Sequence, residues 1–144
     1  MAWDVRTLAA YAVAMIERLT HQWRRETVEQ QAAVAAGTLS PDEAYALTFF
    51  PPAFVDAVDA ALAAYEQEIA SLDPPTDEAV WLAVERVVVT LNGVDLAFDH
   101  HIETMTREEL SEYIDAVLAD AGIDVEALLQ RRGVDEAAGQ WRDW

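Results

Sequence analysis

The densest group of chemically capable side chains lies at residues 95–103, which hold three carboxylates and two histidines. Asp95, Asp99 and Glu103 are spaced four apart, and His100 precedes Glu103 by three positions. On a helix, this spacing would place them on one face. Carboxylate oxygens bind hard divalent cations, and imidazole nitrogens bind borderline ions such as zinc. One hypothesis is therefore a divalent-metal site at Asp95, Asp99, His100 and Glu103.

A solvated helix face or a connector is the favoured interpretation of the same residues. Carboxylate metal sites in helical bundles use Glu-x-x-His on two helices. Here His100 comes before its glutamate, and His21 stands alone. We therefore expect no cofactor, and keep a metal- or ligand-binding bundle, with enzymatic activity, as an alternative.

The sequence contains no pattern typical of other kinds of catalysis. The chain has no cysteine, which leaves out thiol chemistry, disulfides and cysteine zinc sites. Neither a G-x-S-x-G turn nor a glycine-rich phosphate loop is present. The three serines, Ser40, Ser71 and Ser111, have no histidine nearby in sequence. A non-catalytic role is favoured.

Charge is the strongest functional signal in the chain. It has 27 acidic residues, nine arginines, no lysine and a formal net charge of −18. Residues 26–85 hold twelve acids and no basic residue. A large field of one sign attracts partners of opposite charge and repels polyanions. The alternative is that the acidity reflects compositional bias and only keeps the protein in solution.

A small basic and aromatic group precedes this acidic stretch. Arg18, Arg24 and Arg25 lie close to His21 and Trp23, a combination found in nucleic-acid sites. Since the rest of the chain is strongly acidic, we predict that these arginines face acids of the same molecule. No nucleic-acid partner is expected.

Two aromatic segments pose a choice between packing and binding. Trp141 and Trp144 lie near the end of the sequence, and Phe49-Phe50 precedes two prolines. We predict packing for both segments. Tryptophan is also enriched at binding hot spots, so Trp141 and Trp144 are kept as candidate partner contacts.

Apolar residues recur at spacings of three and four, which predicts an all-α fold. We expect a single domain over residues 1–144, an antiparallel bundle of about four main helices plus short ones. No stretch of 18 apolar residues would span a membrane, and no secretory leader is recognised, so we expect a cytoplasmic protein. The predicted inner faces are Leu8, Tyr11, Ala12, Met15, Leu19 and Trp23; Phe54, Val58, Leu62, Tyr65 and Ile69; Val80, Trp81, Val84, Val87, Val88 and Leu91; and Leu110, Tyr113, Ile114, Val117 and Leu118.

Capping and breaking residues predict where these helices begin and end. The first should run from about Trp3 to Ala36 and stop at Gly37. The expected later starts are a Ser40/Glu43 capping box, Pro52, Thr76, a Thr106/Glu109 capping box and Asp124; the expected later stops are Pro51, Asn92-Gly93, Gly122 and Gly133.

Residues 90–114 resemble a pattern in uncharacterised small helical proteins of GC-rich bacteria. The matching strings are Leu91-Asn92, Ile102-Glu103-Thr104, Arg107-Glu108-Glu109-Leu110 and Tyr113-Ile114, with a Trp-Arg-x-Trp tail. The resemblance implies no known activity. It implies that Glu103 is a buried or pocket carboxylate.

The function expected from the sequence is a non-catalytic, acidic module that binds a basic protein, in the manner of an immunity or inhibitor protein. The expected steering face is Asp56, Asp59 and Glu66, on the outer side of the helix after Pro52. The alternatives are the metal-binding bundle and a housekeeping protein without a specific partner. The oligomeric state is left open.

Overall fold

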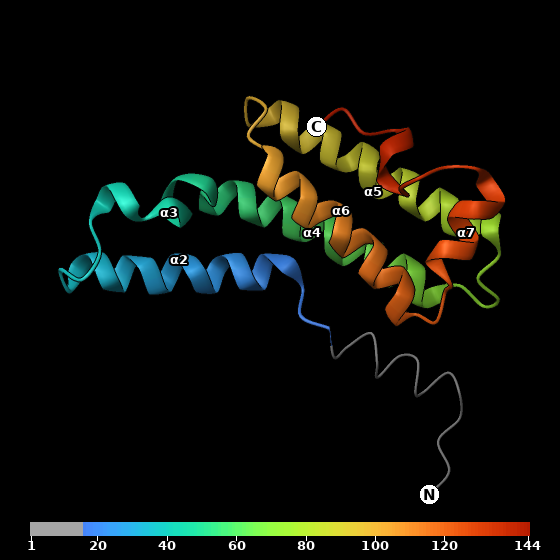
Figure 1. Cartoon of the computed structure of the whole chain (residues 1–144), viewed down its shortest axis with the longest axis horizontal. Coiled ribbons are helices and arrows are strands. Elements are labelled where there is room, and N and C mark those ends of the chain that lie inside the picture. The colour runs from blue at the N-terminus through green and yellow to red at the C-terminus, as the bar shows by residue number, and fades with distance from the viewer. Residues whose placement is uncertain (1–15) are drawn as a thin grey trace, which may run out of the picture.

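The computed structural model describes residues 16–144, and all regular structure in this range is helical (Figure 1). The all-α prediction is confirmed. The longer helices are α2 (Leu19–Ala35), α4 (Pro52–Ser71), α5 (Asp77–Ala97), α6 (Thr104–Asp120) and α7 (Val125–Arg132). The connections contain the short elements η1 (Pro41–Glu43), α3 (Tyr45–Phe49) and η2 (Ala138–Gln140).

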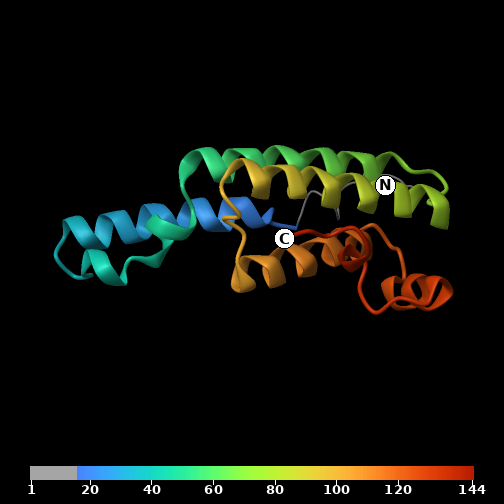
Figure 2. The same cartoon turned by 90° about the horizontal axis from the view of Figure 1, so that it is seen from above.

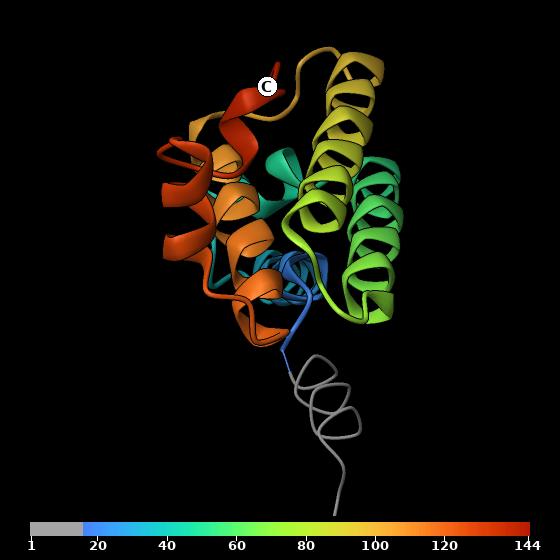
Figure 3. The same cartoon turned by 90° about the vertical axis from the view of Figure 1, so that its right-hand side faces the viewer.

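The helices form two layers, with α4 and α5 in one layer and α2 and α6 in the other (Figure 2). α4 and α5 lie side by side and antiparallel, and their packing is the most extensive among the described residues. α2 and α6 pack against α4 from the other side, and α7 lies outside α6 (Figures 2 and 3). This arrangement leaves one broad side of the α4–α5 pair uncovered by any other described helix.

The first predicted helix differs from the structure at its beginning. Arg18 is extended (ψ 134°), and α2 starts only at Leu19, so a continuous helix from Trp3 is wrong. The expected stripe from Leu8 to Met15 falls outside the described residues. The predicted stop is confirmed, because Gly37 has a φ of +76° and the amide of Thr38 donates back to the carbonyl of Ala33.

The next connection is only partly as predicted. The Ser40 hydroxyl accepts from the amide of Asp42, so Ser40 does cap a turn. That turn is the three-residue element η1, which Ala44 separates from α3, rather than one helix with a Ser40/Glu43 box. Pro52 opens α4 as predicted, in the first-turn position where its missing N–H costs no hydrogen bond.

The second half of α5 also differs from prediction. Asn92-Gly93 does not end the helix, which continues to Ala97. A glycine inside a helix costs about 1 kcal/mol relative to alanine. Leu91, before Asn92-Gly93, and Asp95, after it, are both buried, and their burial outweighs this cost. The chain leaves the helix only at Asp99 and His100, both of which have positive φ.

The start of α6 uses a different residue from the one predicted. Glu103 is the N-cap, and Thr106 occupies the third helical position. The Glu103 amide donates to the Thr106 hydroxyl (2.9 Å), and the Glu103 side chain accepts from the amide at the third position. The predicted box with Thr106 as cap and Glu109 as its partner is therefore wrong. The caps Thr76 and Asp124 and the stops Gly122 and Gly133 are as predicted.

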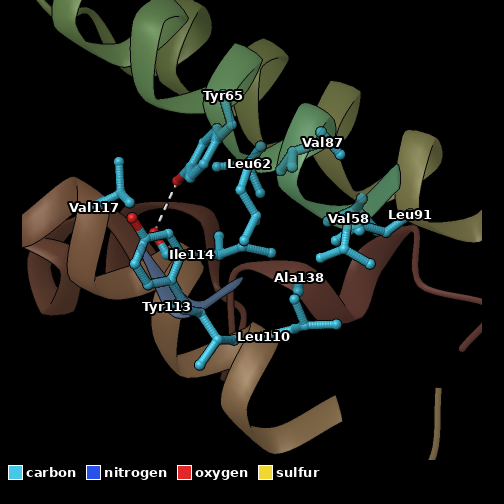
Figure 4. Close-up of a cluster of buried hydrophobic side chains, with 14 of the residues drawn as sticks. Val58, Leu62, Tyr65, Val87, Leu91, Leu110, Tyr113, Ile114, Val117 and Ala138 are labelled. Atoms are coloured by element: carbon cyan, nitrogen blue, oxygen red, sulfur yellow. Dashed lines mark hydrogen bonds between the residues drawn. The ribbon is translucent and has the colours of Figure 1, made fainter. Parts of the chain in front are cut away.

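Every residue of the predicted stripes on α4, α5 and α6 is buried. Figure 4 shows their centre, where Val58 and Leu62 of α4 meet Leu110 and Ile114 of α6. The Tyr65 ring lies in the same cluster, and its hydroxyl donates to the carbonyl of Ile114 at 2.8 Å. This bond links α4 to α6 within the apolar cluster.

Replacing Tyr65 with phenylalanine tests this link. Tyr65→Phe keeps the ring but removes the donor, and we expect a loss of about 1–2 kcal/mol in the free energy of unfolding. Tyr45→Phe is the control, because Tyr45 is 45% exposed. Urea denaturation followed by circular dichroism measures both. Equal stability of the two variants would show that the buried bond contributes nothing.

Candidate functional site

The residues predicted to bind metal do not converge. Asp95 is 3% exposed, and its two oxygens close the loop after α5. One accepts from the amide of Ile102 at 2.9 Å, and the other lies 3.0 Å from Nδ1 of His100. Its carboxylate is therefore used to hold the connection between α5 and α6.

The other two carboxylates of that hypothesis lie in different surroundings. Because α5 ends at Ala97, the four-residue spacing does not put Asp99 and Glu103 on one helical face with Asp95. Glu103 is exposed and caps α6, which corrects the buried carboxylate implied by the resemblance. Across residues 16–144, no group of three His, Cys, Asp or Glu side chains is placed to hold a metal ion.

The neighbouring histidine has a structural role. The Nε2 atom of His101 lies 2.8 Å from the carbonyl of Phe49. Its ring packs edge-on against Phe54, with 4.7 Å between centroids. His101 thus joins the loop after α5 to the end of α3.

The steering face expected on α4 is largely occupied by the chain's own arginine. Arg18 contacts Glu66 through Nε (2.8 Å) and a terminal nitrogen (3.1 Å), and reaches Asp59 at 3.2 Å. The side chains of Asp59 and Glu66 are 22% and 17% exposed, against 71% for Asp56. Placing Asp59 and Glu66 on an open outer face is wrong, and only Asp56 is freely exposed.

The pKa values near this ion pair report the same geometry. Burial by itself raises the pKa of Asp59, but hydrogen bonds from Thr20 and Arg18 outweigh it and the pKa is lowered. Burial, together with the hydrogen bond to Glu66, raises the pKa of Tyr113. Tyr113 donates to Glu66 at 2.9 Å, so this carboxylate joins α2, α4 and α6.

The arginines of the N-terminal part pair with acids of the same chain, as predicted. Arg24 contacts Asp56 at 2.9 Å and Asp59 at 3.5 Å. Arg25 pairs with Glu17. These contacts leave no free basic patch on this part of α2.

The aromatic residues of the tail pack, as predicted. Trp144 is 5% exposed, and its position is set by Asn92, whose side chain donates to the carbonyl of Trp141 and accepts from the amide of Asp143. Trp144 is therefore excluded as an exposed partner contact. Trp141 is half-buried against Trp81 and Arg132, with 6.1 Å between the indole centroids.

A second group of acids lies where α2 packs against α6, and none of them forms an ion pair with an arginine of the described residues. We call Glu26, Glu109 and Glu112 the α2/α6 acidic cluster. The fully buried Trp23 donates its indole N–H to Glu109 at 3.1 Å. Within residues 16–144, no arginine lies at ion-pair distance from any of the three.

The pKa of Glu109 is raised above its usual value, and burial is the largest cause. The Trp23 N–H opposes that effect, and the charges of Glu26 and Glu112 raise the pKa further. Sequence reasoning missed the cluster because Glu109 fitted a capping pattern and Trp23 fitted an apolar stripe. Trp23 and Glu109 are 86 residues apart in sequence, so only the packing of α2 against α6 brings them together.

Residues 38–133 match a family of unknown function, DUF5713, and the chain belongs to this family. This match confirms the resemblance to uncharacterised helical proteins. It includes Glu109 and Glu112 but not Trp23, Glu26 or the tail with Trp141 and Trp144. No curated protein and no solved structure matches the chain. Among the described helices, none has the length and apolar character needed to cross a membrane.

The contrast between Glu66 and Asp56 gives a stability prediction. Glu66→Ala leaves the Arg18 guanidinium and the Tyr113 hydroxyl without their acceptor, and we expect a loss of about 1–3 kcal/mol. Asp56→Ala removes an exposed ion pair and should cost under about 1 kcal/mol. Thermal and urea unfolding of both variants measure the difference. A similar small loss for both would mean that the Glu66 contacts do not tie the helices together.

The raised pKa of Glu109 gives a prediction of pH dependence. Its pKa is higher in the folded than in the unfolded state, so ionisation at rising pH favours unfolding. Glu109→Gln keeps an acceptor for Trp23 and should raise the melting temperature at pH 7. The gain should shrink as pH falls and vanish below about 4, where the unfolded carboxyl is also protonated. Glu43→Gln, an exposed acid outside the cluster, is the control; an equal gain there would assign the effect to net charge.

Proposed function

We propose that the protein is a non-catalytic module that binds a basic protein partner through the α2/α6 acidic cluster. The observation that carries the proposal is Glu109, a half-buried carboxylate held by Trp23 with two further acids beside it and no arginine of the described chain in contact. An arginine or lysine of a partner would supply the missing positive charge.

Most of the chain's arginines are already committed elsewhere, which supports this choice of surface. Arg18, Arg24, Arg25, Arg86, Arg131 and Arg142 all form ion pairs with acids of the same chain. Those paired acids have little attraction left for a partner. Acids outside these pairs produce most of the external field of a chain with net charge −18.

The mechanism would combine steering and anchoring. The net negative field would speed the encounter with a basic surface, and salt would screen it over about 8 Å at physiological ionic strength. Contact would then pair a partner's cation with Glu109, lowering the raised pKa of that carboxyl and favouring its ionised form. The exposed side chain of Asp56 and the half-buried ring of Trp141 would add only peripheral contacts, because Asp56 is already paired with Arg24 and Trp141 packs against Trp81.

The sharpest form of the proposal is an immunity or inhibitor protein that blocks a basic toxin or nuclease. Such a partner presents the clustered arginines and lysines that the cluster lacks. We place this role in the cytoplasm, where a chain without cysteine needs no oxidising environment. No nucleic-acid partner is proposed, because phosphates carry the same sign of charge as the module.

The experiment compares two triple variants against a basic partner recovered from native lysate. Glu26→Gln with Glu109→Gln and Glu112→Gln removes three charges from the cluster. Glu43→Gln with Glu78→Gln and Glu126→Gln removes three exposed charges elsewhere. We expect the first to weaken binding by about tenfold or more and to reduce its salt dependence, and the second to change it little. Surface-based kinetics at low and physiological salt measure both.

Two results would contradict the proposal. If no basic partner is recovered, the acidity serves solubility and not recognition. If both triple variants lose affinity equally, the overall charge acts and the α2/α6 acidic cluster has no particular role. Circular dichroism of each variant establishes that the fold is retained.

A further inference from the structure

The uncovered side of the α4–α5 pair carries a line of exposed aliphatic side chains. Leu82, Val89 and Leu96 of α5 are 49%, 51% and 67% exposed. They are spaced seven residues apart, so they lie along one side of the helix at intervals of about 10 Å. Exposed large apolar residues aligned in this way mark an interaction surface more often than isolated ones do.

The neighbouring helix presents a complementary surface. The outward positions of α4 beside this line are Ala57, Ala60 and Ala64. Between the helices lies a cleft of about 240 Å³, whose lining includes these alanines, Arg86 and Thr90. We call Leu82, Val89 and Leu96 with Ala57, Ala60 and Ala64 the α4/α5 outer face. Protruding and recessed parts thus lie side by side on one surface.

The part of α5 that lies on this face carries little charge. Between residues 79 and 97, the exposed positions of α5 are Leu82, Arg86, Val89, Thr90, Gly93, Leu96 and Ala97. None is acidic, and Arg86 is paired with Glu68. Glu85 is half-buried beside Leu82 and Val89. Two molecules of charge −18 repel each other least when they approach through such a face.

Gly93 is a second, independent feature of the same side of α5. A glycine within a helix costs about 1 kcal/mol relative to alanine. Gly93 lacks a positive φ, and a Cβ at this position would meet nothing within 4 Å. The fold of one copy therefore does not require glycine here. A missing side chain on an exposed helix face allows a partner to approach closely.

We propose that a second copy of this chain covers the α4/α5 outer face, forming a two-fold symmetric dimer with antiparallel α5 helices. A two-fold interface requires each contact to occur twice, with the residues exchanged. The line is symmetric about its middle residue, so antiparallel pairing puts Val89 against Val89 of the other copy and Leu82 against its Leu96. The same register brings Glu85 opposite the open position at Gly93.

This inference is independent of the proposed binding function. The α2/α6 acidic cluster lies on other helices, so pairing through α5 leaves it available. The dimer would bury the α4/α5 outer face and leave the α2/α6 acidic cluster accessible.

The oligomeric state of the full chain tests the proposal. Multi-angle light scattering and sedimentation should show a dimer at high micromolar concentration. Val89→Asp places two charges against each other on the symmetry axis and should raise the dimer dissociation constant at least tenfold. Val28→Asp is the matched control, because Val28 is a 64% exposed valine on α2, and it should leave the dimer intact. Gly93→Leu should also weaken the dimer without destabilising the single copy.

Cross-linking fixes the orientation, and the absence of native cysteine makes it specific. Val89→Cys should form a disulfide-linked dimer with itself, whereas Leu82→Cys should cross-link to Leu96→Cys in a mixture and poorly to itself. A parallel pairing would reverse the Leu82 result and overturn the register. A wild-type chain that is monomeric throughout the concentration range, or equal effects of Val89→Asp and Val28→Asp, would overturn the dimer.

Discussion

The carboxylate of Glu66 joins three segments that are distant in sequence. Glu66 is a residue of α4. Its carboxylate accepts hydrogen bonds from Arg18, the N-cap residue of α2, and from Tyr113 of α6. Apolar burial supplies most of the stabilisation, but it has no direction and tolerates sliding of one helix along another. A directional, partly buried ion pair favours one arrangement over its neighbours. Its contacts tie the residue before α2 and a tyrosine of α6 to the same point on α4.

The parts of the fold that depend on neighbours in sequence could be predicted. The apolar stripes of α4, α5 and α6 and the stops at Gly37, Gly122 and Gly133 follow from local spacing and backbone preference. The errors occur where distant contacts decide. Arg18 leaves the helix where its side chain pairs with α4, across 48 residues. α5 passes through Gly93 because buried residues on either side of it remain helical.

The candidate site was less accessible to prediction for a related reason. Sequence shows how many carboxylates exist, but packing decides which of them have an arginine. Asp59 and Glu66 looked available by helical periodicity and are partly buried against Arg18. Glu109 looked like a capping residue and lies half-buried beside Trp23. The residues predicted to bind metal around Asp95 do not converge for a simpler reason. Their four-residue spacing aligns side chains only along a continuous helix, and α5 ends at Ala97.

The uneven distribution of charge connects the two proposed surfaces. A chain with three times as many acids as arginines cannot neutralise every face, and its ion pairs lie mostly between helices, where they support the fold. The remaining acids then have to collect on surfaces that face water, such as the α2/α6 acidic cluster. The exposed positions of α5 between residues 79 and 97 include no acid, so two copies that approach through this face repel each other less than two copies that approach through acidic surfaces. In a dimer formed there, two acidic clusters would be carried by one particle, and a partner with repeated basic segments would bind both with a gain set by effective concentration. The same excess of carboxylates would thus determine where the protein meets its own copy and where it meets another protein.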